Sequence, residues 1–141
     1  MLGSHCTKTY SQTQETIALS SGESEFYGIV KAASVGIGIK SLMCDLGMEV
    51  EAQVNTDSSA ARSIASRKGA GRVRHVEVRE LWVQEKVRRG EMYIVKVKGE
   101  NNVADGLTKH VDRNKLDQYM KACGFVFRDG RHDLCPHLGG A

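Results

Sequence analysis

The sequence lacks any run of about eighteen apolar residues, the length that a membrane-spanning helix needs. Its N-terminus also lacks the pattern of a secretory signal peptide. We therefore expect a soluble, intracellular protein that is not secreted and has no membrane contact. The chain has 141 residues and 40% hydrophobic content, which is sufficient for one globular domain with a modest core.

A Cys-x-x-Cys pair is also missing. The four cysteines are scattered, which argues against a disulfide framework and favours reduced, structural thiols. An alternative is a small zinc-binding module, because zinc prefers Cys and His ligands in tetrahedral geometry. Its ligands would be Cys123, His132, Cys135 and His137. The simpler interpretation places Cys123 in the core and the histidines on the surface.

The net charge of +3 is too small to indicate a partner, but the positive charge is unevenly distributed. Between Arg62 and Gly90 there are nine Lys or Arg residues and three Glu residues. Basic residues on a loop and a helix can follow a phosphate backbone. The alternative is a solvated helix face on which Glu and Arg side chains pair.

Hydrophobic periodicity and turn residues predict an α/β fold, with a mixed sheet and flanking helices. Strands are expected at about 6–19, 50–56 and 91–98, and helices at 21–46, 58–65, 75–89 and 114–122. The first strand is polar and is expected near a sheet edge. In the last strand we expect Tyr93, Val95 and Val97 on the buried face. Residues 1–122 would form the domain, and residues 123–141 an irregular tail.

Two acidic residues mark the start of the long helix. Ser20 or Ser21 can cap it, and the pair Ser20 and Glu23 fits a capping box. Glu25 is less routine, because it flanks the apolar stripe that begins at Phe26, where an unpaired carboxylate is costly. The sequence therefore predicts that Glu23 caps the helix and that Glu25 has another role.

Two further acids occupy comparable places. Asp57 follows a predicted strand, where open α/β sheets place ligands, and Asp105 begins a late helix. If they meet Glu25, the three carboxylates would suit Mg²⁺ or Mn²⁺. Each has a simpler interpretation: Glu25 as a solvated first-turn residue, Asp57 as a helix cap, and Asp105 as a residue favoured by the helix dipole.

Four segments resemble the C-terminal part of the ribonuclease H domain of copia-type LTR retrotransposon Pol polyproteins. They are LSSGESEFY at 19–27, TDSSAA at 56–61, RHVEVR at 74–79 and VADGLTK at 103–109. Each is weak alone, but all four occur in the family's order, across about residues 8–112. The resemblance implies a ribonuclease H-like fold in which Glu25, Asp57 and Asp105 are the catalytic, metal-binding acids.

The resemblance also implies two-metal hydrolysis of the RNA strand of RNA–DNA hybrids, with Mg²⁺ or Mn²⁺. The implied partners are the hybrid and a reverse transcriptase domain of the same polyprotein, in the cytoplasm (in a virus-like particle) or the nucleus. The hybrid would be held through its phosphates and 2′-hydroxyl groups. The basic contacts would be Arg62, Arg67, Lys68, Arg72, Arg74, His75 and Arg79.

The chain departs from the family pattern in two ways. The family's first catalytic aspartate lies upstream of Met1, with the first strand and most of the second, so we expect a truncated fold with weak or no activity alone. No histidine occurs in the loop from Val97 to Glu100, so proton transfer there is not supported. The alternative is a non-catalytic, nucleic-acid-binding remnant of a retroelement.

Overall fold

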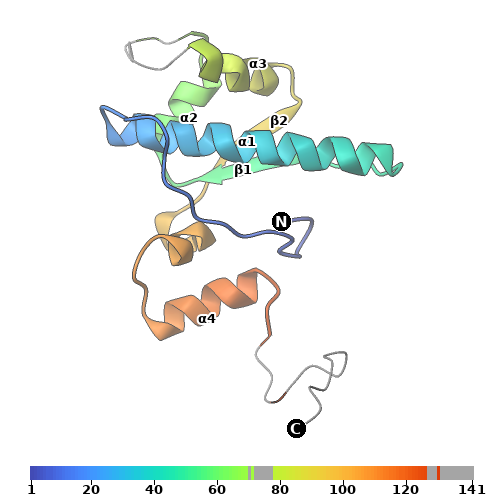
Figure 1. Ribbon diagram of the computed structural model, residues 1–141, viewed down its shortest axis with the longest axis vertical. Coiled ribbons are helices and arrows are strands. Elements are labelled where there is room, and N and C mark those ends of the chain that lie inside the picture. Colours follow the sequence, from blue (N-terminus) through green and yellow to red (C-terminus); the bar gives the residue numbers. More distant parts are fainter. Residues whose placement is uncertain (70, 72–77, 127–129, 131–141) are drawn as a thin grey trace, which may run out of the picture. The chain divides into compact units, whose positions relative to one another are not determined.

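The computed structural model describes residues 1–69, 71, 78–126 and 130. The chain divides into two compact units (Figure 1). One comprises Gln12–Asn102, and the other comprises Met1–Ser11 together with Val103–Ala141.

The unit of residues 12–102 contains a small parallel sheet and the helices that pack on it. Its elements are α1 (Ser21–Asp45), β1 (Ala52–Thr56), α2 (Ser59–Ser66), η1 (Val78–Leu81), α3 (Trp82–Arg88), β2 (Met92–Lys96) and η2 (Gly99–Asn101). In the described part of the chain the sheet has two strands, with Ala52 opposite Met92 and Thr56 opposite Lys96. This arrangement confirms the α/β class, and the ribonuclease H-like fold stays a prediction.

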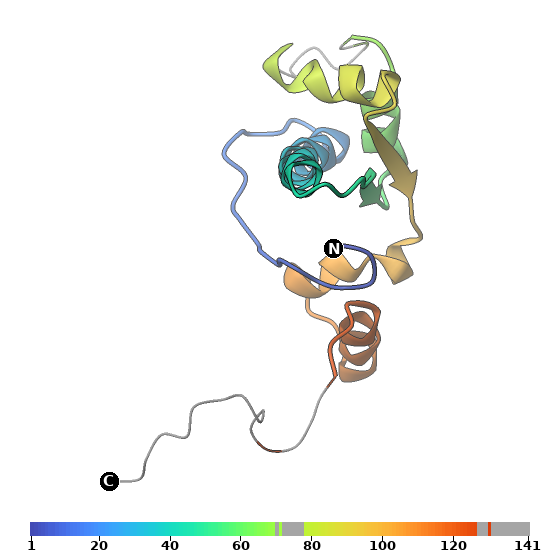
Figure 2. The ribbon, with the colours of Figure 1, turned by 90° about the vertical axis from the view of Figure 1, so that its right-hand side faces the viewer.

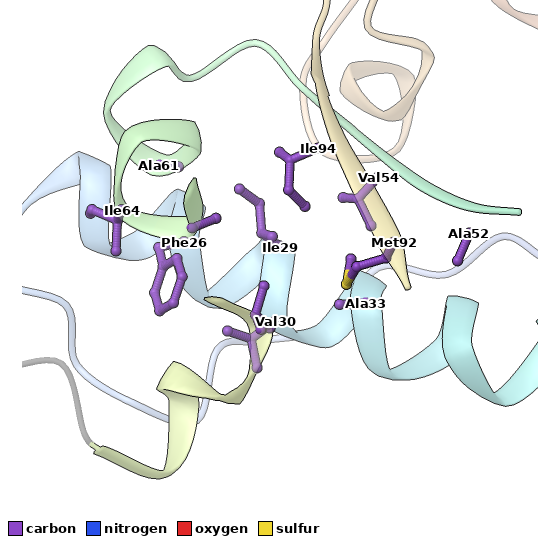
Figure 3. Packing of buried hydrophobic residues seen from close by; sticks show 12 residues of the cluster. Phe26, Ile29, Val30, Ala33, Ala52, Val54, Ala61, Ile64, Met92 and Ile94 are labelled. Atoms are coloured by element: carbon purple, nitrogen blue, oxygen red, sulfur yellow. The ribbon is translucent and has the colours of Figure 1, made fainter. Parts of the chain in front are cut away.

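The hydrophobic core lies between α1, α2, α3 and the sheet. Figure 2, in which α1 is seen end-on, shows both strands on one side of this helix. From α1, Phe26, Ile29, Val30 and Ala33 face the core at helical spacing, as the sequence pattern predicts (Figure 3). They pack with residues of the other elements: Ala52, Val54, Ala61, Ile64, Ala65, Val83, Met92 and Ile94.

The buried face of β2 differs from the prediction. Met92 and Ile94 are buried, whereas Tyr93 is 46% exposed and Val95 is 38% exposed. Both sets of alternating residues are apolar, so the sequence pattern identifies a strand without identifying which face is covered. Packing of β2 against α2 and α3 decides between them, and it selects Met92 and Ile94.

The predicted strand at 6–19 is absent, because this segment has no regular secondary structure. Its threonines favour extended backbone, but a strand also needs a partner for its N–H and C=O groups. Near its end Gln14 forms side-chain hydrogen bonds instead, accepting one from Ser24 Oγ at 2.8 Å. Local β-propensity therefore does not produce a strand here.

By length and composition, α1 is the one helix among the described residues that could cross a membrane. The core helix of a soluble protein passes the same test. Phe26, Ile29 and Ala33 of α1 are buried against the sheet and the neighbouring helices. In this structure α1 therefore packs as a core helix, and the expected lack of membrane contact stays a prediction.

The second unit contains η3 (Val103–Leu107) and α4 (Arg113–Ala122). Asp112 caps α4 by accepting a hydrogen bond from the Lys115 N–H at 2.9 Å. Tyr119 of α4 is buried, and its ring lies against Gly106, where an added Cβ would be 3.0 Å from Cδ2. The first residues of the chain join this unit through a hydrogen bond from the Cys6 N–H to the Cys123 carbonyl at 3.3 Å.

Candidate active site and nucleic-acid interface

Glu23 and its cap set the start of α1. Ser20 is the N-cap, and its Oγ accepts a hydrogen bond from the Glu23 N–H at 3.2 Å. The Glu23 carboxylate, in a residue only 5% exposed, accepts one from the Leu19 N–H at 2.8 Å. In a capping box this second bond goes to the N-cap residue itself, so the motif is shifted by one residue. The predicted capping role of Glu23 is confirmed.

Glu25 lies on the exposed side of α1, next to the buried Phe26. The same end of α1 meets the start of α2, because a Cβ added at Gly22 would lie 3.0 Å from Ala60 Cβ. Gly22 and Glu25 are three residues apart and are therefore neighbours on the helix surface. The close approach at Gly22 thus places Glu25 near the start of α2.

Asp57 lies at the carboxyl end of β1 and is half-buried. The cap of α2 is the next residue, Ser58, whose Oγ accepts a hydrogen bond from the Ala61 N–H at 3.1 Å. A Cβ added at Gly99, just after β2, would lie 3.5 Å from Asp57 Oδ2. Asp57 therefore borders the edge where both parallel strands end, which is the usual ligand edge of an open α/β sheet.

Asp105 lies in η3, in the other unit. Its Oδ2 pairs with Lys109 Nζ at 2.8 Å, and its side chain is 17% exposed. Among the described residues, no three His, Cys, Asp or Glu side chains are close enough together to hold a metal ion. The described side chains therefore form no assembled metal centre, and the convergence of Glu25, Asp57 and Asp105 stays a prediction.

Gln84, which the sequence did not single out, holds the start of the basic loop. Its Nε2 donates to the Ile64 carbonyl at 2.8 Å and to the Gly69 carbonyl at 3.0 Å, and its Oε1 accepts from the Gly69 N–H at 2.8 Å. The residue is 8% exposed, so these bonds are formed away from water. A buried amide within a helix therefore fixes the path of the chain after α2.

The predicted basic contacts have different surroundings. Arg62 and Lys68 are exposed. Arg67 is half-buried, and its guanidinium lies so close to Gly71 that a Cβ there would be 2.7 Å from Cζ. The structure does not describe the remaining predicted contacts: Arg72, Arg74 and His75 lie outside the described residues, as does the side chain of Arg79.

The cations of α3 are paired. Glu85 binds Arg88 and Arg89, and Glu91 binds Lys86. Partial desolvation raises the pKa of Glu85, but the hydrogen bond from Arg89 and the charges of Arg88 and Arg89 outweigh it, so the pKa is lowered. The hydrogen bond from Lys86 likewise lowers the pKa of Glu91. Lys86, Arg88 and Arg89 therefore fit the alternative interpretation, a solvated helix face on which acidic and basic side chains pair.

A shallow hollow of about 230 Å³ lies on the outer face of α2. It is lined by Ser59, Arg62, Ser63, Ser66 and Lys96. The four α2 residues have the spacing of one helix face, which the sequence alone could have shown. Lys96, at the end of β2, reaches them through a hydrogen bond from its Nζ to Ser59 Oγ. The described residues of the lining carry two cations and three hydroxyl groups.

The sequence was compared with those of known proteins. It is 31% identical over 116 residues to the retrovirus-related Pol polyprotein from transposon TNT 1-94 of Nicotiana tabacum. The match covers 81% of this chain but 9% of that polyprotein, so the chain spans less than a tenth of the curated relative's length. No protein-family model and no solved structure matches the chain. The likeness supports a retroelement-derived domain that originates from a retrotransposon Pol polyprotein.

Proposed function

We propose that this domain is of the ribonuclease H type and hydrolyses the RNA strand of RNA–DNA hybrids within its parent polyprotein. The observation that carries the proposal is the position of Asp57 at the edge where β1 and β2 both end. The starts of α1 and α2 lie beside this edge and contact each other at Gly22 and Ala60. Open α/β sheets bind their ligands at the carboxyl ends of the strands, and Glu25 lies on the helix next to this edge. The relationship to a Pol polyprotein supplies the biological context.

The proposal includes the partners and the metal. RNA–DNA hybrid is the substrate, and the reverse transcriptase region of the same polyprotein is the protein partner. Asp57, Glu25 and Asp105 are carboxylates, and hard oxygen ligands of this kind suit Mg²⁺ or Mn²⁺. A bound ion of this type would activate water and stabilise the leaving oxygen of a phosphodiester.

A metal titration tests the proposal on the full chain. Mn²⁺ added to isotope-labelled protein is expected to broaden the backbone amide signals of Glu25 and Asp57 in NMR spectra. Asp57→Asn should abolish this broadening, whereas Asp45→Asn, at the far end of α1, serves as the matched control and should leave it unchanged. The same two variants should be compared for Mg²⁺-dependent cleavage of a labelled hybrid.

A second candidate function is hybrid binding without catalysis, which the exposed Arg62 and Lys68 favour because neither depends on the carboxylates. Hybrid binding that persists in EDTA, without Mn²⁺ broadening at Asp57, would establish this alternative and overturn the enzymatic one. The zinc-binding alternative depends on His132, Cys135 and His137, which lie outside the described residues.

A further inference from the structure

The hollow on α2 is distinct from the predicted carboxylate site and has different chemistry. Its cations are Arg62 and Lys96, and in the described part of the chain neither forms an ion pair. Lys86 and Arg89 contrast with them, since these two cations are matched by Glu91 and Glu85. Among the described residues, therefore, no carboxylate is paired with the positive charge of the hollow.

The hydroxyl groups of the hollow complement this charge. Ser59, Ser63 and Ser66 share the outer face of α2 with Arg62. Serine hydroxyls donate hydrogen bonds, and lysine and arginine are the usual charged donors to phosphate. The described lining residues include no carboxylate, so they offer hydrogen-bond donors from both cations and from the hydroxyls. This combination suits a tetrahedral oxyanion.

The position of Lys96 is fixed by the fold. It has the same parity along β2 as the buried Met92 and Ile94, so it leaves the sheet on the face that the helices cover. Its hydrogen bond with Ser59 holds the ammonium group over the start of α2. Ser59 follows Asp57 by two residues, so the hollow begins next to the proposed catalytic edge.

We propose that this hollow binds a phosphate group of the nucleic-acid backbone, through Arg62, Lys96 and the α2 serines. The inference rests on the proposed function for the identity of the ligand, because it assigns the anion to the hybrid that Asp57 and Glu25 would act on. Phosphate contacts of this kind position a nucleic acid without reading its sequence. Free inorganic phosphate has the same chemistry as a backbone phosphate, and the experiment below distinguishes the two ligands.

The test uses the full chain, a fluorescently labelled RNA–DNA hybrid and inorganic phosphate. Arg62→Gln and Lys96→Gln each remove one charge, and each should reduce the salt slope of hybrid binding by about 0.7 to 0.9. Ser63→Asp should weaken hybrid binding more than its near-isosteric control Ser63→Asn. Lys31→Gln, which removes a charge from the exposed surface of α1, should weaken binding less than either hollow variant.

Inorganic phosphate provides the second readout. It should shift the amide signals of Ser59, Arg62 and Ser63, and Arg62→Gln should remove these shifts. If phosphate shifts these signals but the hollow variants bind hybrid like the wild type, the hollow takes free phosphate and the nucleic-acid assignment is overturned. If phosphate shifts nothing, the site itself is overturned, even if the hybrid still binds and the proposed function stands. Circular dichroism confirms that each variant is folded.

Discussion

At the scale of single residues, two glutamates on one helix have different surroundings. Glu23 is buried and bonded to the backbone, whereas Glu25 is exposed. The capping role was predictable from the sequence because it depends on residues within one helical turn. The proposed metal-binding role of Glu25 stays a prediction, because it depends on elements that are distant in the sequence.

We expect Glu23→Ala to lower the free energy of unfolding by about 1 to 3 kcal/mol, because it removes the hydrogen bond between the Leu19 N–H and the buried Glu23 carboxylate. Glu25→Ala should change it by less than about 0.5 kcal/mol, as for an ordinary surface substitution. Urea unfolding followed by circular dichroism measures both. Equal losses in the two variants would contradict the separation of a capping residue from a candidate ligand.

A second residue-scale feature is Gly22, whose missing side chain lets α1 approach Ala60. Gly22→Ala should lower the free energy of unfolding by about 1 to 3 kcal/mol through overpacking. Gly38→Ala is the matched control: an added Cβ there meets nothing within 4 Å, so it should raise stability by about 0.5 to 1 kcal/mol. In an Ala60→Gly background, Gly22→Ala should no longer lower the free energy of unfolding. A persistent cost there would mean that the contact is not the cause.

At the scale of elements, those with strong local signals were predictable, whereas the α-helix predicted at 75–89 begins only at Trp82 in the described chain. α1 and α4 lie close to their predicted ranges, because an apolar stripe and a capping residue are local signals. The prediction of a strand at 6–19 was wrong because a strand needs a pairing partner from elsewhere in the chain. The prediction of the buried face of β2 was wrong because Tyr93 and Val95 are as apolar as the residues that the helices cover.

The link between α2, the basic loop and α3 depends on Gln84. Gln84→Leu should lower the free energy of unfolding by about 1 to 3 kcal/mol, since the Gly69 N–H and two carbonyls lose a buried partner. It should also speed tryptic cleavage after Arg67 and Lys68, measured by limited proteolysis and mass spectrometry. Gln53→Leu, on the exposed side of β1, should change neither. Unchanged cleavage in Gln84→Leu would show that other contacts hold the loop.

At the scale of the whole molecule, the chain forms two units, and one of them joins residues from both ends of the sequence. Cys6 and Ser4 lie beside Cys123 and Gly124 within it. Nothing in the local sequence indicates this, because the contact closes a loop of more than a hundred residues. The expectation of reduced thiols is confirmed for the described cysteines, because Cys6, Cys44 and Cys123 are free.

The cysteines differ in expected reactivity. Burial, together with the neighbouring Cys6 thiol, raises the pKa of Cys123, so less of it is thiolate at neutral pH. In a Cys135→Ser background, iodoacetamide should label the exposed Cys44 faster than Cys123, as followed by peptide mass spectrometry. Raising the pH should reduce the difference, and unfolding in urea should abolish it. Equal labelling of the folded protein would contradict the contact between Cys6 and Cys123.

The long sequence separation between α1 and β2, which share one core, has a consequence for biosynthesis. Phe26, Ile29 and Ala33 of α1 emerge from the ribosome well before Met92, which helps to cover them. At ribosomal rates the intervening chain takes on the order of seconds to synthesise. During that interval α1 is an uncovered helix with the length and hydropathy of a membrane segment. We therefore expect the apolar stripe of α1 to be open to chaperone binding until the second strand has been synthesised.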